Sequence, residues 1–232
     1  MTASDLDRYL QPTDFLDADA AEVQEFADRA LDAAGLDRDS ARTDKAVALF
    51  HAVRDGFRYD PYDIASDPAD YRASAVVGTD SAWCVTKSVV LAASARAVGI
   101  PARLGFADVK NHLTSAKLSA SMGTDLFAWH GFAELLLPDG DEGERWFKLS
   151  SAFNIELCER FGVKVLEFDG TADALMHPFD EAGNRHMEYV RERGSFDDLP
   201  LEQILADFAV IYPDTLVAGP GGAEAAGDDE FA

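Results

Sequence analysis

The fold is decided by one stretch, Asp80-Ser81-Ala82-Trp83-Cys84-Val85-Thr86-Lys87, in which a cysteine comes immediately before an apolar helical run. That run covers residues 88–98 and ends at Gly99, and the proline at position 101 cannot prolong it. Either Asp80 or Ser81 is a suitable N-cap. Cys84 is therefore expected in the first turn of a buried helix.

A cysteine in that position has two interpretations. The unpaired backbone N–H groups and the dipole at a helix start favour a thiolate over a thiol, which is one way to prepare a nucleophile. A cysteine next to Trp83 can also simply fill the core, since free cysteines are among the most buried residues. This stretch by itself leaves both interpretations open.

Composition limits the partners. The chain has 232 residues, with 20 Lys plus Arg against 43 Asp plus Glu, a formal net charge of −23. Such a charge argues against a nucleic acid or an anionic membrane as partner. It suits a peptide or amide substrate that is cationic, and it equally suits a habitat of high salt. Nothing in the composition indicates an oligomeric state.

No cofactor or metal is expected. The two cysteines, Cys84 and Cys158, provide neither a disulfide framework nor a multi-cysteine zinc site, and no CxxC or HExxH occurs. His177 and His186 lie among acids, but their spacing fits no metal motif, so a solvated surface is expected. The N-terminus lacks the features of a signal peptide, and no apolar run is long enough for a membrane span. A cytoplasmic protein is predicted.

Periodicity and turn residues predict a mixed order of elements. Helices are expected over residues 20–34, 44–57 (capped by Thr43), 84–98, 154–162 and 200–212. Strands are expected over 102–107, 126–137, 145–149 and 163–168, the second and third forming a hairpin. Residues 60–80 are expected to form a long loop or short helices, 108–126 a long loop, and 173–194 a mostly irregular segment. We predict one domain over residues 1–217, with its core at about 43–170, and a disordered acidic tail over 218–232.

His130 is the best candidate partner for the sulfur, because a nucleophilic thiolate is normally paired with an imidazole. It lies on the predicted strand 126–137. If Leu137 pairs near Glu144 across the turn, His130 lies opposite about Ser151. Asn154, a few residues further, is then close enough to orient the ring through its amide oxygen. Cys158 is expected in the core.

The motif Trp83-Cys84, the segment Arg96-Ala97-Val98-Gly99-Ile100-Pro101-Ala102-Arg103 and the motif Ala128-Trp129-His130 before Trp146 resemble the transglutaminase-like superfamily, part of the papain-like cysteine enzymes. The resemblance covers about residues 43–155. It implies an α+β fold in which a catalytic cysteine at the N-terminus of a buried helix packs on an antiparallel β-sheet. It also implies that Cys84 is the nucleophile and His130 the general base and acid.

One position departs from the family pattern. Members usually carry an aspartate four residues after the hairpin tryptophan, where this chain has Ser150. A serine can orient an imidazole but cannot stabilise an imidazolium as a carboxylate does. Asn154 is the preferred third residue, with Ser150 itself, Asp169 or a weakened site as alternatives. The predicted function is amide or peptide hydrolysis through a thioester on Cys84, and the alternative is a non-catalytic binding or scaffold protein on the same fold.

Overall fold

The computed structural model describes residues 6–112 and 122–212, and the fold is α+β. Its helices are η1 (Asp7–Leu10), α2 (Ala21–Ala33), α3 (Arg42–Gly56), η2 (Pro68–Tyr71), α4 (Ala73–Val76), α5 (Cys84–Ala97), η3 (Gly140–Glu142), α7 (Ile155–Phe161) and α8 (Leu201–Ile211). Its strands are β1 (Arg58–Tyr59), β2 (Ser81–Ala82), β3 (Ala102–Asn111), β4 (Leu126–Pro138), β5 (Glu144–Leu149) and β6 (Met187–Phe196).

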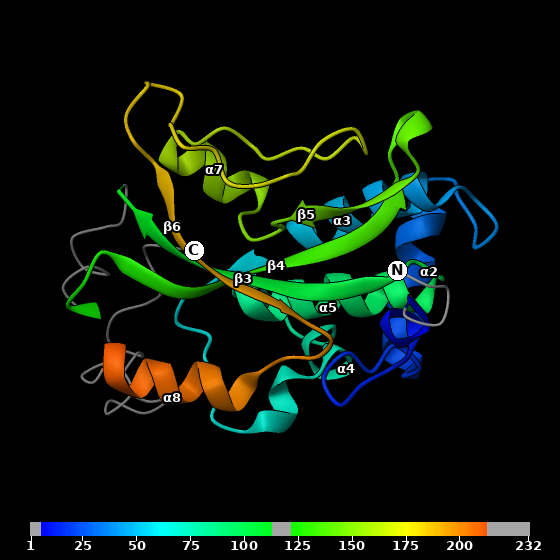
Figure 1. The fold of residues 1–232 in the computed structure, drawn as a ribbon, viewed down its shortest axis with the longest axis horizontal. Helices are drawn as coiled ribbons and strands as arrows, with labels where there is room; N and C mark the ends of the chain where they lie inside the picture. Colours follow the sequence, from blue (N-terminus) through cyan, green and yellow to red (C-terminus); the bar gives the residue numbers. More distant parts are fainter. Residues whose placement is uncertain (1–5, 113–121, 213–232) are drawn as a thin grey trace.

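An antiparallel sheet of order β5-β4-β3-β6 forms the centre of the molecule (Figure 1). The strands β4 and β5 form the predicted hairpin, and β3 separates β4 from β6. A short parallel pair, β1 with β2, brings the end of α3 next to the start of α5, with Arg58 opposite Ser81. The sheet and this pair therefore converge on the N-terminus of α5.

Helix α5 lies across one face of the sheet and is buried on all sides (Figure 1). Its run of valine, leucine and alanine has no polar face, which is typical of a helix enclosed by other elements. Several polar side chains are enclosed with it, and that of Lys87 is fully buried. Its Nζ donates to the carbonyl oxygens of Arg54 at 2.8 Å and Phe57 at 2.9 Å. Lys87 thus satisfies carbonyls at the C-terminal end of α3 and fixes α3 against α5.

Most predicted helices and the hairpin are confirmed, and two details are wrong, the cap of α3 and the strand over residues 163–168. Thr43 does not cap α3, since the helix begins at Arg42 with Ala41 as N-cap. Residues 163–168 form no strand, although Val163, Leu166 and Phe168 are buried. The apolar pattern of this segment therefore arises from burial against the core and not from pairing with a neighbouring strand.

The strand β6 falls inside the segment predicted to be irregular. It is an edge strand paired only with β3, and most of its side chains are exposed. Charged residues occupy much of it, as is common on strands whose outer edge meets solvent, so the apolar alternation that identifies buried strands is missing. The expected loop 108–126 also begins later, because β3 continues to Asn111.

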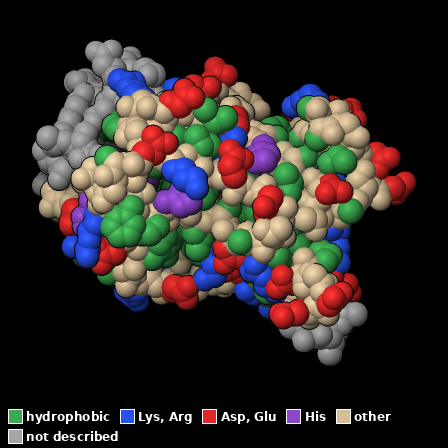
Figure 2. Space-filling model, turned by 90° about the horizontal axis from the view of Figure 1, so that it is seen from above, with side chains coloured by type: hydrophobic (Ala, Val, Ile, Leu, Met, Phe, Trp, Pro, Cys, Tyr) green, Lys and Arg blue, Asp and Glu red, His purple; other side chains and the backbone are tan. Residues whose placement is uncertain are grey.

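The predicted tail 218–232 and the predicted domain end at residue 217 lie outside the described residues. Acidic side chains are scattered over the face drawn in Figure 2, with basic ones between them. In the described ranges no helix combines the length and the apolar character that crossing a bilayer requires.

Candidate active site

Cys84 is the first residue of α5, as predicted, but the cap differs. The N-cap is Trp83, and the Thr86 hydroxyl accepts a hydrogen bond from the Trp83 backbone N–H at 3.2 Å. The expected caps Asp80 and Ser81 lie further upstream, and Ser81 belongs to β2. The chain therefore enters the helix directly from the short parallel pair.

The strand that carries His130 approaches this helix start very closely at Gly131. A Cβ at Gly131 would lie 3.0 Å from the Cα of Val85 and 3.2 Å from the carbonyl oxygen of Cys84. Only a residue without a side chain fits there without a shift of the helix. The backbone N–H of Gly131 also reaches the sulfur of Cys84. The sulfur is therefore in contact with the residue that follows His130.

Both side chains are uncharged at neutral pH. Burial raises the pKa of the Cys84 thiol to about 11, and the backbone N–H groups of Gly131, Val85 and Cys84 oppose this only in part. Burial likewise lowers the pKa of the His130 imidazole to about 4. The helix start favours the anion, as the sequence suggested, but removal from water outweighs it.

His130 has Ser150 as its hydrogen-bond partner, with 3.2 Å between Nε2 and Oγ. Both side chains are buried. The hairpin register is shifted by one from the expected one, since Leu137 pairs with Arg145. Its ladder ends where Ala133 pairs with Leu149, so the chain turns at Ser150 and brings that hydroxyl to the ring.

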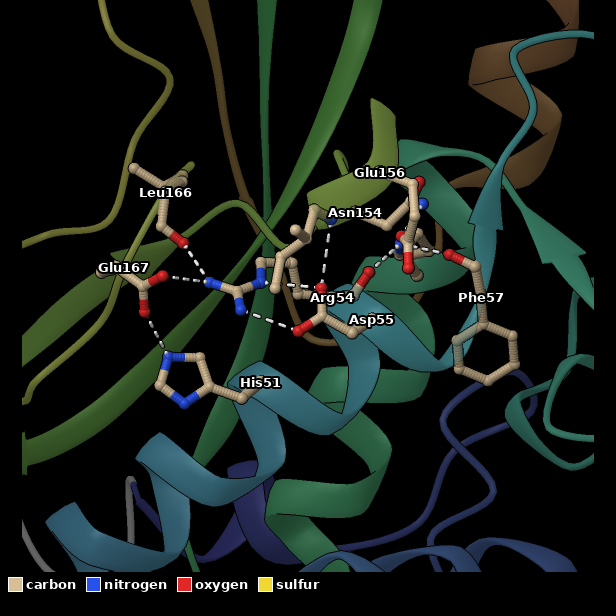
Figure 3. A network of polar contacts seen from close by, with 10 residues as sticks. His51, Arg54, Asp55, Phe57, Asn154, Glu156, Leu166 and Glu167 are labelled. Carbon is tan, nitrogen blue, oxygen red and sulfur yellow. Dashed lines mark hydrogen bonds and ion pairs between the residues drawn. The ribbon is translucent and has the colours of Figure 1, made fainter. Parts of the chain in front are cut away.

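Asn154 lies in a different network, whose labelled members are shown in Figure 3. Its Oδ1 accepts from the backbone N–H of Tyr59 at 3.1 Å, and its Nδ2 donates to Glu156 at 2.7 Å. Both amide atoms are therefore engaged away from the imidazole. The alternative Asp169 is exposed and accepts from Thr171. Among the described contacts, neither residue takes the expected place beside His130.

The network in Figure 3 holds the segment after Ser150 in position. Arg54, at the end of α3, binds Asp55 at 2.7 Å and Glu167 at 2.9 Å. Asp55 also accepts from the backbone N–H of Ile155 at 3.3 Å, the first residue of α7. The C-terminal end of α3 is thereby tied to α7 and to the chain near residue 167.

A second network, which the sequence reasoning missed, lies directly before His130. Trp129 has a φ of +58°, a left-handed conformation that bulky residues rarely adopt, at a bulge where the β3–β4 register shifts. Its backbone N–H donates to Asp108 at 3.1 Å, and its indole Nε1 donates to Asp207 at 2.9 Å. Arg193 bridges these two carboxylates and lies over the indole, 4.6 Å from the ring centre.

This network fixes a strained backbone conformation whose effect is to set the direction of the His130 side chain. Part of it had a sequence signal. Tyr189 and Val190 are residue types that strands favour, and they lie on β6, the strand that carries Arg193, although apolar alternation is missing there. The pairing of Arg193 with Asp108 and Asp207 has no signal in a single sequence.

Cys84 and His130 line the same cavity, which has a volume of about 100 Å³. Its other described walls come from β1 and the chain after it, from β3, β4 and α8, and from the region of Phe153. They are largely aromatic: Tyr59, Trp83, Phe127, Phe153, Phe208 and Tyr212. A small enclosed space thus opens on a thiol and an imidazole together.

The remaining candidates lie elsewhere. Cys158 is buried on α7, in the core as expected, and does not line this cavity. His186 is buried and stacks on Phe153, and His112 contacts Glu188. Within residues 6–112 and 122–212, no group of three or more histidine, cysteine and acidic side chains is arranged to hold a metal ion.

Comparison with known proteins gave one family match and one structural match. The model of the transglutaminase-like superfamily matches residues 29–151, more than half of the chain. A solved structure of a proposed cysteine protease from Cytophaga hutchinsonii aligns with a TM-score of 0.47 and 14% identity, over 84% of this chain and 55% of its own. The chain thus spans about half the length of that protein. No curated protein sequence matches. On the strength of the family match, the chain belongs to the transglutaminase-like superfamily.

Proposed function

We propose that this protein is a cysteine-dependent acyl-transfer enzyme that hydrolyses amide or peptide bonds through a thioester on Cys84. The observation that carries the proposal is that Cys84 and His130 line one enclosed cavity, with the sulfur against the backbone N–H of Gly131. A nucleophile next to a general base is the arrangement that covalent acyl transfer requires.

The proton inventory of the site fits a general-base route. At neutral pH the thiol holds its proton and the imidazole is free to take one. As the sulfur attacks the carbonyl carbon, the thiol proton moves to His130 and a C–S bond forms. The backbone N–H groups at the start of α5 stabilise the oxyanion. His130 then gives its proton to the leaving amine as the C–N bond breaks.

Water completes the cycle. It attacks the thioester carbon while His130 takes a proton from it, the C–S bond breaks, and the thiol is restored as the carboxylic acid leaves. An amine in place of water would give a new amide. Hydrolysis is the preferred outcome because the site needs no second binding subsite for it.

Ser150 takes the orienting role in this proposal, in place of Asn154. With Nε2–H donating to the Ser150 hydroxyl, the lone pair of Nδ1 is left for the thiol proton. A serine fixes the tautomer but adds no negative charge to stabilise an imidazolium, so it orients the base without raising its pKa.

Labelling by an amide-type electrophile that reacts with thiols is the direct test. We expect the probe to modify Cys84 in the native protein and to lose that reaction in Cys84→Ala and in His130→Ala. Peptide mass spectrometry locates the label. Labelling of Cys158 to an equal extent, or labelling of Cys84 that does not need His130, would refute the enzymatic proposal.

A non-catalytic binding protein is the second candidate. The observation in its favour is that serine replaces the usual acid while burial opposes ionisation of both partners. This reading predicts that Cys84 reacts only as its thiol titrates, and that removal of His130 does not change the rate.

A further inference from the structure

We infer that the cavity beside Cys84 selects an acyl group that is uncharged and apolar, of about the size of a branched aliphatic side chain. This inference rests on the proposed function and names the substrate class for it. It departs from the simplest reading of the net charge, which favours a cationic substrate.

The walls of the cavity carry the inference. Besides Cys84 and His130, the described lining residues include no aspartate, glutamate, lysine or arginine. Ile64, Val109 and Met187 complete the ring of aromatic residues. Although the chain carries an excess of acids, none of the described ones lines this space.

Desolvation points the same way. The cavity keeps both an acid and a base in their neutral forms, which shows that a charge of either sign is poorly solvated there. A charged acyl group would lose its water without gaining a counter-ion. An apolar group loses nothing comparable and gains contact with the aromatic walls.

The size of the space limits the group. At about 100 Å³, the cavity is smaller than an engineered cavity of about 150 Å³ that holds benzene. The space therefore holds the branched end of an acyl chain, about four to six carbons or the order of a leucine side chain, and the methylene next to the carbonyl lies at its opening beside the sulfur.

One polar contact is available to the ligand. Trp83 lines the cavity and is buried, and its indole Nε1 has no hydrogen-bond partner among the described residues. A buried donor without a partner costs free energy, which a ligand oxygen recovers. The preferred ligand is therefore an apolar chain attached to a carbonyl group.

Two acyl groups of equal shape and different charge test the effect of charge at constant size. We would compare p-nitrophenyl esters of 5,5-dimethylhexanoic acid and of 4-(trimethylammonio)butanoic acid, which differ by a carbon in place of a cationic nitrogen. In acylation of Cys84 at pH 8, the neutral ester is expected to react at least about tenfold faster. An equal rate, or a faster reaction of the cation through the aromatic walls, would overturn the inference.

Binding provides a readout that does not depend on catalysis. The primary amides of the same two acids would be titrated against Cys84→Ala protein by intrinsic tryptophan fluorescence. Tighter binding of the neutral amide, with no acylation by either ester, would sink the proposed function and leave the inference intact. Acylation of Cys84 that is faster with the cationic ester would support the proposed function and overturn the inference.

A carboxylate introduced into the wall of the cavity should change the preference between the neutral and the cationic ester. Ile64→Asp is expected to shift the neutral-to-cation ratio toward the cation by about tenfold, whereas Ile64→Asn, of the same shape, lowers both rates without changing the ratio. Ile64 is only half-buried, so both variants are expected to fold. Phe127→Asp and Phe127→Asn repeat the comparison at a second half-buried wall residue. Val190→Asp, at an exposed position on β6, controls for net charge.

Discussion

Cys84 and Cys158 are alike in chemistry and unlike in surroundings. Both are buried, and burial raises the pKa of each thiol to about 11. Cys84 opens on a cavity shared with a neutral imidazole. Cys158 is packed on α7, close enough to Lys87 and Arg54 that these cations act on its pKa. Asp55 and Glu159 oppose these cations, so charged neighbours of both signs surround the cysteine without a cavity.

The comparison teaches that thiol acidity alone does not identify a nucleophile in this fold. The buried base near Cys158 is Lys87, and its Nζ donates to two backbone carbonyls, which fixes it in a structural role. His130 makes a hydrogen bond through Nε2 alone, to Ser150, and no described contact occupies Nδ1. Two features therefore distinguish the Cys84 site from the Cys158 site. Cys84 has a cavity that a substrate can enter, and its neighbouring base has a free lone pair.

Removal of each thiol should give the largest contrast. Cys84→Ala is expected to lower kcat for an activated apolar ester roughly a thousandfold or more, because no other group replaces the nucleophile. Cys158→Ala should leave kcat within about twofold and lower the free energy of unfolding by about 1–2 kcal/mol through lost packing. Steady-state kinetics and denaturant unfolding measure the two effects. A comparable loss of activity in both variants would contradict the assignment of different roles to the two cysteines.

The next largest effect is expected in how the free energy of unfolding depends on pH through His130, at the Cys84 site. Because the pKa of His130 falls from about 6.5 when unfolded to about 4 when folded, the unfolded chain binds more protons between these values. Unfolding free energy should therefore decline as pH falls from 6.5 to 4, by up to about 3 kcal/mol more in the native protein than in His130→Asn.

Denaturant unfolding across that pH range measures the difference. Cys158→Ala, at a buried thiol whose pKa of about 11 lies far above this range, is the control and should keep the native slope. If His130→Asn retains the same decline, burial does not hold this imidazole neutral, and the contrast between the two cysteine sites loses its electrostatic basis.

The smallest effect is expected at the hydroxyl that orients His130. Ser150→Ala should lower kcat by about tenfold with little change in KM, since the ring loses its fixed tautomer. Ser151→Ala is the control, because Ser151 is equally buried and its Oγ has no described partner. Ser150→Asp should raise the imidazole pKa and move the lower limb of the pH–rate profile upward. A similar loss in both alanine variants would show that Ser150 acts only through packing.

The sequence predicted the parts of the site that local pattern encodes. A cysteine before an apolar run gave the start of α5, and the turn between two apolar runs gave the hairpin that carries His130. These features depend on residues close in the chain, where capping and periodicity act.

What a single sequence could not supply depends on distant packing. The hairpin ladder ends at Ala133 and Leu149, and the path of the chain beyond it places Ser150 at His130 and leaves Asn154 to Tyr59 and Glu156. Depth of burial, which makes both partners neutral, is a property of the assembled core. The bulge at Trp129 depends on Asp108 and Arg193, which are far apart in the chain and meet only in the sheet.

The most direct test of the central claim is the intact mass of the protein a few seconds after mixing with the p-nitrophenyl ester of 5,5-dimethylhexanoic acid. The account predicts one added acyl group, located on Cys84, released by hydroxylamine as a thioester, and absent from His130→Asn. An unmodified protein, or an acyl group that forms on Cys84 equally well without His130, would contradict it.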